Sequence, residues 1–128
     1  MSEKRTLLSI VELGGYPDFT ALYHQHGYLV ETITTGRKAI SRLRQGGYQV
    51  VVAEFNYQRE FRDRTSSLES ILATVQGVAG VKVVVLFNPA DQEPLARLHA
   101  RFAGLIAQPL PVSREAMEEI LNRLTAGG

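Results

Sequence analysis

The sequence of 128 residues contains no cysteine, which excludes disulfide frameworks, thiolate nucleophiles and cysteine-ligated zinc. It also has no dominant charge, because fourteen basic and thirteen acidic side chains leave a formal net charge of +1. So small a net charge gives little field to attract nucleic acid or an anionic membrane, and we expect neither as a partner.

Long apolar runs are missing as well. No stretch approaches the roughly 20 apolar residues of a membrane-spanning helix, and the run at residues 7–11 is too short for the core of a signal peptide. We therefore expect a soluble, cytoplasmic protein. With 45% apolar residues, a chain of this length can build one core, which favours a single domain over residues 1–128.

Short apolar runs alternate with segments of helical period. The runs predict strands at residues 7–11, 28–33, 48–53, 81–87 and 105–107. The segments between and after them predict helices at 18–25, 35–47, 65–77, 90–102 and 113–124. Apolar strands that alternate with helices are typical of an α/β fold in which a parallel sheet is covered on both faces.

Polar residues, prolines and glycines mark the predicted helix ends. Ser66 and Glu69 fit a capping box, Ser113 can cap the last helix, and Gly46 and the glycine after it end the second helix. Pro94 is tolerable only in the first turn of its helix. These signals support the helix boundaries.

Two carboxylates follow predicted strands. Glu54 ends the third run and Glu12 ends the first, so both are expected at the crevice outside the carboxyl ends of the strands. No nucleophile or oxyanion donor is recognisable beside them, and the histidines lack metal-ligand spacing, so we expect no enzyme, metal or cofactor. Gly14 and Gly15 lack the spacing of a phosphate-binding loop and are interpreted as a flexible turn.

The run TTGRKAISRLRQGGYQVVVAE, residues 34–54, resembles the second helix and third strand of the receiver domain of two-component response regulators. Gln108 and Pro109, followed by a capped helix, match a Lys-Pro that receivers carry there, usually with a cis peptide bond. The likeness covers nearly the whole chain. It implies a flavodoxin-like, CheY-like fold: a doubly wound, five-stranded parallel sheet of order 2-1-3-4-5 with helices on both faces.

The resemblance fails at the residues that carry the chemistry. A working receiver holds Mg²⁺ with an acidic pair, takes the phosphoryl group on an Asp, and uses a Ser or Thr and a Lys at the next two strand ends. The corresponding positions form a degenerate phosphoacceptor pocket of Glu12, Leu13, Glu54, Asn56, Phe87, Asn88, Gln108 and Pro109. The resemblance therefore implies a pseudo-receiver without catalytic residues.

Physical chemistry supports that implication. Mg²⁺ demands near-octahedral oxygen ligation, and phosphoryl transfer depends on positioning and charge stabilisation, so losing an acid at Leu13 and a cation at Gln108 disables both. Phe87 is predicted to fill the space that Mg²⁺ and phosphate would occupy. The expected function is a non-phosphorylatable receiver-like signalling domain that acts through protein–protein interaction.

Glu54 leaves several alternatives open. It is interpreted first as a tolerated acid at a solvated crevice, second as a permanent imitation of a phosphorylated aspartate. A third alternative is weak residual Mg²⁺-dependent phosphoryl acceptance on Glu54. A fourth is binding of a small anion or nucleotide at a crevice formed by Gly14, Glu54, Asn56, Asn88 and Gln108.

The expected partner is another protein or an output domain of unknown identity. Receivers often pair through the fourth and fifth helices, so the resemblance also raises a homodimer through those helices. The interaction face would include Arg97, Arg101, Leu105, Glu118 and Glu119.

Overall fold

The computed structural model describes residues 5–55, 68–78 and 80–126. One sheet of parallel strands runs in the order β2-β1-β3-β4-β5. The strands are β1 (Arg5–Ile10), β2 (Tyr28–Ile33), β3 (Val50–Phe55), β4 (Lys82–Phe87) and β5 (Ile106–Pro109). The predicted fold class and strand order are confirmed.

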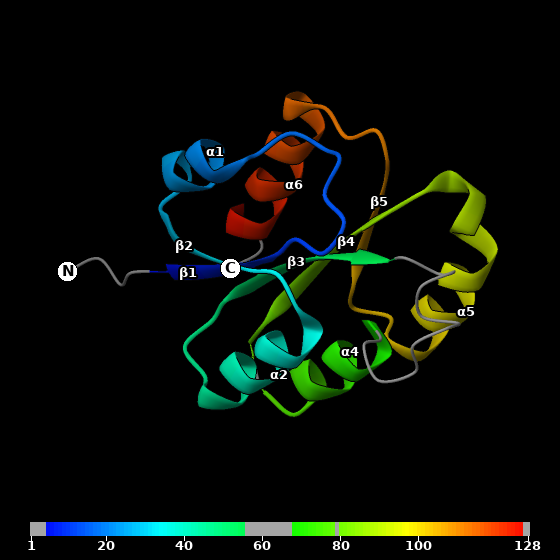
Figure 1. The fold of residues 1–128 in the computed structure, drawn as a ribbon. Helices are drawn as coiled ribbons and strands as arrows, with labels where there is room; N and C mark the ends of the chain where they lie inside the picture. The colour runs from blue at the N-terminus through cyan, green and yellow to red at the C-terminus, as the bar shows by residue number, and fades with distance from the viewer. Residues whose placement is uncertain (1–4, 56–67, 79, 127–128) are drawn as a thin grey trace.

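Helices cover both faces of the sheet (Figure 1). They are α1 (Thr20–Gln25), α2 (Gly36–Gln45), α4 (Leu68–Gln76), the 3-10 helix η1 (Pro89–Asp91), α5 (Gln92–Arg101) and α6 (Arg114–Ala126). In Figure 1, α1 and α6 lie on one face, while α2 and α4 lie on the other with α5 beside them. Each predicted helix is present in the described residues, with Pro94 in the first turn of α5.

The helix caps follow from local hydrogen bonding. The Thr35 hydroxyl accepts from the Lys38 N–H at 3.2 Å, and the Ser113 hydroxyl accepts from the Ala116 N–H at 3.0 Å, which satisfies N–H groups that the first turn leaves open. The predicted capping box lies partly outside the described residues, because Ser66 is not among them.

The core forms two layers because side chains alternate along each strand. Val51 and Val85 pack with α2, α4 and α5, whereas Val52 and Leu86 pack with α1 and α6. Every residue of β3 is buried, as expected for the central strand of a sheet covered on both faces.

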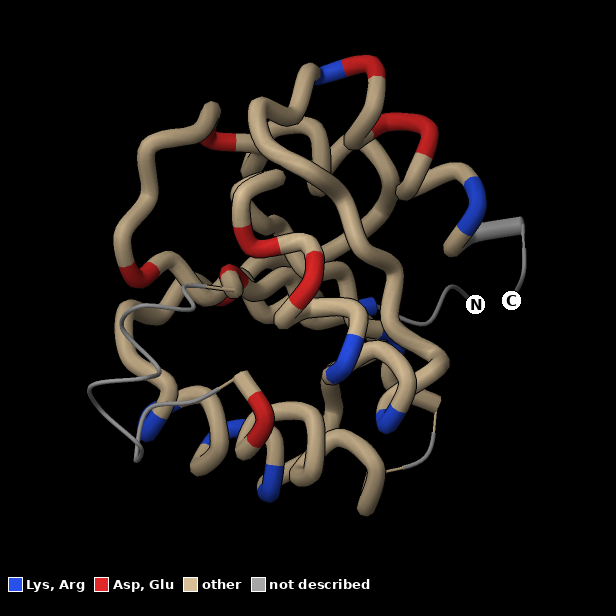
Figure 2. Tube along the Cα trace, turned by 90° about the vertical axis from the view of Figure 1, so that its right-hand side faces the viewer, with Lys and Arg blue, Asp and Glu red and all other residues tan. Residues whose placement is uncertain are grey.

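The carboxyl ends of the strands share one edge, because all the strands are parallel. Figure 2 looks onto this edge and shows acidic and basic positions spread around the described trace. The resemblance implied a cis peptide bond between Gln108 and Pro109. The structure instead has its cis peptide bond two residues later, between Leu110 and Pro111. Among the described helices, none is long and apolar enough to cross a membrane.

Candidate functional site

Glu54 lies near the carboxyl end of β3, in register with Leu86 of β4. Its side chain is only 5% exposed, and it is the single buried acidic or basic side chain among the described residues. A buried carboxylate is costly unless hydrogen bonds replace its water. The expectation of a solvated acid is therefore wrong, because the strand extends two residues further than predicted and carries Glu54 into the interior.

Four donors from the loop after β1 enclose the Glu54 carboxylate. The N–H groups of Glu12 and Gly14 donate to Oε2 at 3.0 and 3.3 Å, and the N–H of Leu13 donates to Oε1 at 2.9 Å. The Tyr16 hydroxyl donates to Oε2 at 2.6 Å. We call these four donors, together with Glu54, the carboxylate clasp.

The loop adopts this shape because glycines allow it. Gly14 and Gly15 have φ angles of 72° and 86°, in the left-handed region that glycine enters without steric cost. Successive N–H groups in such a turn converge on one side and form an anion-binding concavity. The N–H of Val11 bonds the carbonyl of Ile33 at 2.9 Å and anchors the start of the loop on β2.

Tyr16 is a reliable donor in the carboxylate clasp. Burial, the hydrogen bond to Glu54 and the charge of that carboxylate all raise the pKa of Tyr16 above its ordinary value. The phenol therefore stays protonated at neutral pH. Hydrogen bonds to an ionised acceptor are about twice as strong as neutral ones, so the clasp compensates for burial of the carboxylate.

The other predicted pocket residues lie around this edge in varied roles. Leu13 is 61% exposed, so its side chain points away from the carboxylate that its N–H contacts. The Asn88 side chain accepts from the Ala90 N–H at 2.9 Å and caps η1. The Gln108 amide donates to the carbonyl of Pro109 at 3.2 Å. Asn56 lies outside the described residues.

Phe87 does not fill the space beside Glu54. It pairs in register with Phe55, the residue after Glu54, so the alternation of side chains places the ring on the opposite face of the sheet. There it is 7% exposed within the core formed with α2, α4 and α5. The prediction that Phe87 fills the space of Mg²⁺ and phosphate is wrong, because Phe87 is a core residue and the loop after β1 takes the space at Glu54.

The sequence predicted that Glu12 and Glu54 lie at the same edge of the sheet, but not which atoms of the two residues are in contact. The contact uses the Glu12 backbone N–H, and the same holds for Leu13 and Gly14. No signal in the sequence indicated Tyr16. The Gly14–Gly15 pair was the available signal for the concavity, and it was interpreted as a flexible turn.

The predicted interaction face on α5 and α6 is only partly exposed. Arg97 and Glu119 are exposed and Glu118 is half-buried, whereas Leu105 is buried in the core. Arg101 forms an ion pair with Glu69 of α4 in the same chain. Its guanidinium also lies 5.4 Å from the centre of the Phe102 ring.

Metal ligands do not cluster in the part of the chain that the structure describes. No group of three His, Asp or Glu side chains there is placed to hold an ion. At the carboxylate clasp the loop presents N–H groups toward Glu54, whereas Mg²⁺ requires oxygen ligands.

No protein-family model matches the sequence, and no curated protein matches it. Several solved structures, however, are similar to this chain. A response regulator receiver protein from Sinorhizobium medicae is 18% identical, with a TM-score of 0.74 over 97% of this chain and 96% of the other. A receiver domain from Clostridium thermocellum is 15% identical, with a TM-score of 0.75 over 96% and 95%.

A third similar structure is the inactive form of the regulatory domain from the repressor of iron transport regulator. It is 16% identical, with a TM-score of 0.68 over 95% of this chain and 93% of the other. The chain therefore has the CheY-like fold of response-regulator receiver domains over nearly its whole length.

Proposed function

We propose that this chain is a receiver-like signalling module that takes no phosphoryl group and acts by binding another protein. The observation that carries the proposal is the carboxylate clasp: the acid at the phosphoacceptor position is buried and already bonded by four donors.

Phosphoryl acceptance requires a carboxylate oxygen that can attack phosphorus in line with the leaving group. Oε2 of Glu54 accepts from Glu12, Gly14 and Tyr16, and Oε1 accepts from Leu13, so both oxygens are engaged. An attack would first have to break these bonds and open the loop. Residual phosphoryl acceptance on Glu54 is therefore disfavoured.

Binding of a small anion or nucleotide at the crevice is disfavoured by the same contacts. An anion would need the N–H groups of Glu12, Leu13 and Gly14, and the chain's own carboxylate already occupies them. A second anion there would meet the charge of Glu54. The clasp instead holds the loop after β1 in one conformation, as a permanent internal anion would.

The remaining surfaces are then the means of signalling. We propose a protein partner or an output domain, met in the cytoplasm, rather than a substrate. The regulatory domain of the iron-transport repressor shares this fold and belongs to a protein described as a regulator, which supports a regulatory use of the scaffold. A homodimer through α5 and α6 stays a further proposal, with exposed Arg97 and Glu119 as its polar groups.

The test is incubation with Mg²⁺ and acetyl phosphate, and separately with Mg²⁺ and beryllofluoride. Intact mass and amide NMR spectra should show no adduct and no Mg²⁺-dependent shift at Glu12, Leu13 or Gly14. A receiver domain with an intact acidic pocket, treated in parallel, controls for the reagents. A stoichiometric, Mg²⁺-dependent adduct on this chain would refute the proposal.

A further inference from the structure

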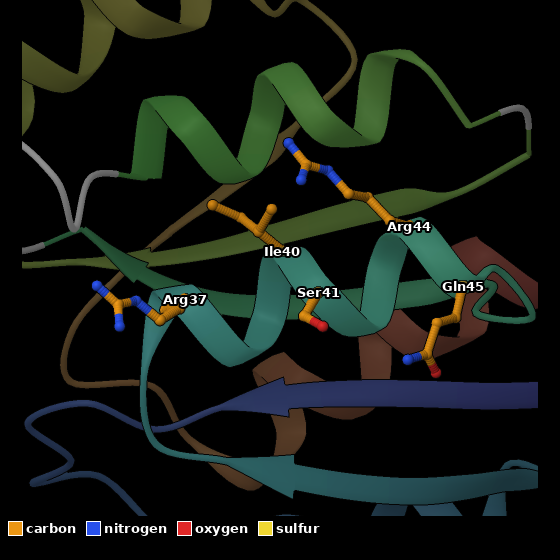
Figure 3. A pocket seen from close by; sticks show the side chains of 5 residues that line it. All are labelled: Arg37, Ile40, Ser41, Arg44 and Gln45. Atoms are coloured by element: carbon orange, nitrogen blue, oxygen red, sulfur yellow. The ribbon is translucent and has the colours of Figure 1, made fainter.

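Helix α2 is the most cationic element of the described chain. It carries Arg37, Lys38, Arg42 and Arg44 and no acidic residue. The rest of the sequence holds ten basic and thirteen acidic residues, so the near-neutral total conceals a cationic helix on a net acidic body. Figure 3 shows α2 beside α4.

Most of the charge on α2 is not neutralised by neighbours. Arg42 pairs with Glu31 at 3.2 Å. Arg37, Lys38 and Arg44 are exposed and form no ion pair within the described residues. The acid on α4, Glu69, is bonded to Arg101 on the far side. The exposed side chains of Arg37, Lys38 and Arg44 are therefore available to an anionic partner.

Two hollows meet on this surface. One, of about 490 Å³, is lined by Arg37, Ile40, Ser41, Arg44 and Gln45. The other, also about 490 Å³, is lined by Arg44, Ala73, Thr74, Gly77 and Val78. Arg44 belongs to both, so a shallow depression crosses from α2 to α4 with a cation at its centre. Ile40 and Arg44 turn toward α4 in Figure 3.

The spacing along α2 defines what fits. Arg37 and Arg44 are seven residues apart, almost two turns, so they share one stripe and lie about 10 Å apart along the axis. Half-buried Ile40 lies between them. Two cations that bracket an apolar contact at this spacing complement a helix with two acids seven residues apart and an apolar residue between them.

We propose that the depression on α2 and α4, lined by Arg37, Ile40 and Arg44, docks an acidic amphipathic helix of a protein partner. The role of this docking surface in signalling rests on the proposed function, and the inference adds the chemistry of the protein partner. A nucleic acid or an anionic membrane fits less well, because the body around α2 carries more acids than bases and would repel an extended polyanion.

The experiment uses a helical alanine-based peptide with two glutamates seven residues apart and a leucine between them. Titrated at low salt into isotope-labelled protein, it should shift the amides of Arg37, Ile40 and Arg44. The double variant Arg37→Glu/Arg44→Glu should bind about tenfold or more weakly, since each exposed pair contributes modestly and reversal adds repulsion. Added salt should weaken binding.

Matched controls separate position from charge. Arg5→Glu/Arg123→Glu makes the same change in net charge at exposed sites outside α2 and should bind like the wild type. A peptide with glutamines in place of the glutamates should not bind. Circular dichroism checks that each variant is folded, and the milder Arg37→Gln/Arg44→Gln repeats the test if the reversal unfolds the protein.

Three outcomes would overturn the inference. The first is that the wild type does not bind the peptide, or that the two glutamate double variants bind it equally. The second is that the protein binds duplex DNA or phosphatidylserine vesicles more tightly than the peptide. The third is that the protein self-associates and that Arg37→Glu/Arg44→Glu abolishes this self-association. An acyl phosphate adduct at Glu54 would sink the proposed function without moving peptide affinity, so the two failures are distinguishable.

Discussion

Replacement of Glu54 by Gln tests the carboxylate clasp with almost no change in shape. Oε2 accepts from Glu12, Gly14 and Tyr16, and Oε1 accepts from Leu13. An amide has one acceptor oxygen. In its best orientation that oxygen replaces Oε2, and its NH₂ group then faces the Leu13 N–H, donor against donor.

The cost follows from these contacts. One hydrogen bond to a charged acceptor is lost, worth about 1.5–3 kcal/mol, and three others weaken as their acceptor becomes neutral. Removal of a buried charge offsets part of this loss. We expect the free energy of unfolding to fall by about 2 kcal/mol, which for a domain of this size lowers Tm by roughly 8 °C.

Urea unfolding followed by circular dichroism measures the change. Glu119→Gln, at an exposed site, is the matched control and should stay within about 0.5 kcal/mol of the wild type. Tyr16→Phe should lower the free energy of unfolding by about 1.5–3 kcal/mol, the contribution of one hydrogen bond to a charged acceptor. This effect should shrink when Glu54→Gln is already present, because the two groups share one hydrogen bond. A Glu54→Gln variant as stable as the wild type would refute this account of the site.

Three further measurements test other parts of the structure. Burial, the hydrogen bond to Glu31 and the charge of that carboxylate raise the pKa of Tyr48 to about 12. In the unfolded chain Tyr48 ionises at a lower pH, so the stability that protonated Tyr48 contributes is complete below about pH 10 and is lost as the pH rises toward 12. In urea titrations the free energy of unfolding of Tyr48→Phe should therefore fall less at alkaline pH than that of the wild type. Gly14→Ala should cost about 1–2 kcal/mol because its φ is 72°, whereas Gly104→Ala, where φ is not positive, should cost far less by thermal melting. If α5 and α6 form a homodimer, Arg97→Glu should shift the sedimentation equilibrium toward monomer, and an unchanged mass distribution would count against that interface.

The periodicity of the sequence was sufficient to predict the fold class. Alternating apolar runs and helical segments predicted each strand and α-helix that the structure describes, and the five-stranded sheet follows the order that the resemblance implied. Strand ends were less predictable. The third strand was expected at 48–53 and lies at Val50–Phe55, and that shift takes Glu54 from solvent into the interior.

The near-neutral charge of the chain was a poor guide to its surface. Summed over all residues it suggested no charged partner, yet the cations of α2 lie together on one helix. The residues themselves were visible in the run TTGRKAISRLRQGG. What was missing was that Ile40 and Arg44 face α4 and that the acid on α4, Glu69, is paired with Arg101.

The sequence by itself determined the alternation of strands and helices and the caps, because these depend on residue types and on contacts close along the chain. The tertiary structure alone decided the state of Glu54, since its bonding partners lie about 40 residues away and three of them are backbone groups. Backbone N–H groups are present at nearly every residue, so only the path of the chain determines which of them converge on a carboxylate.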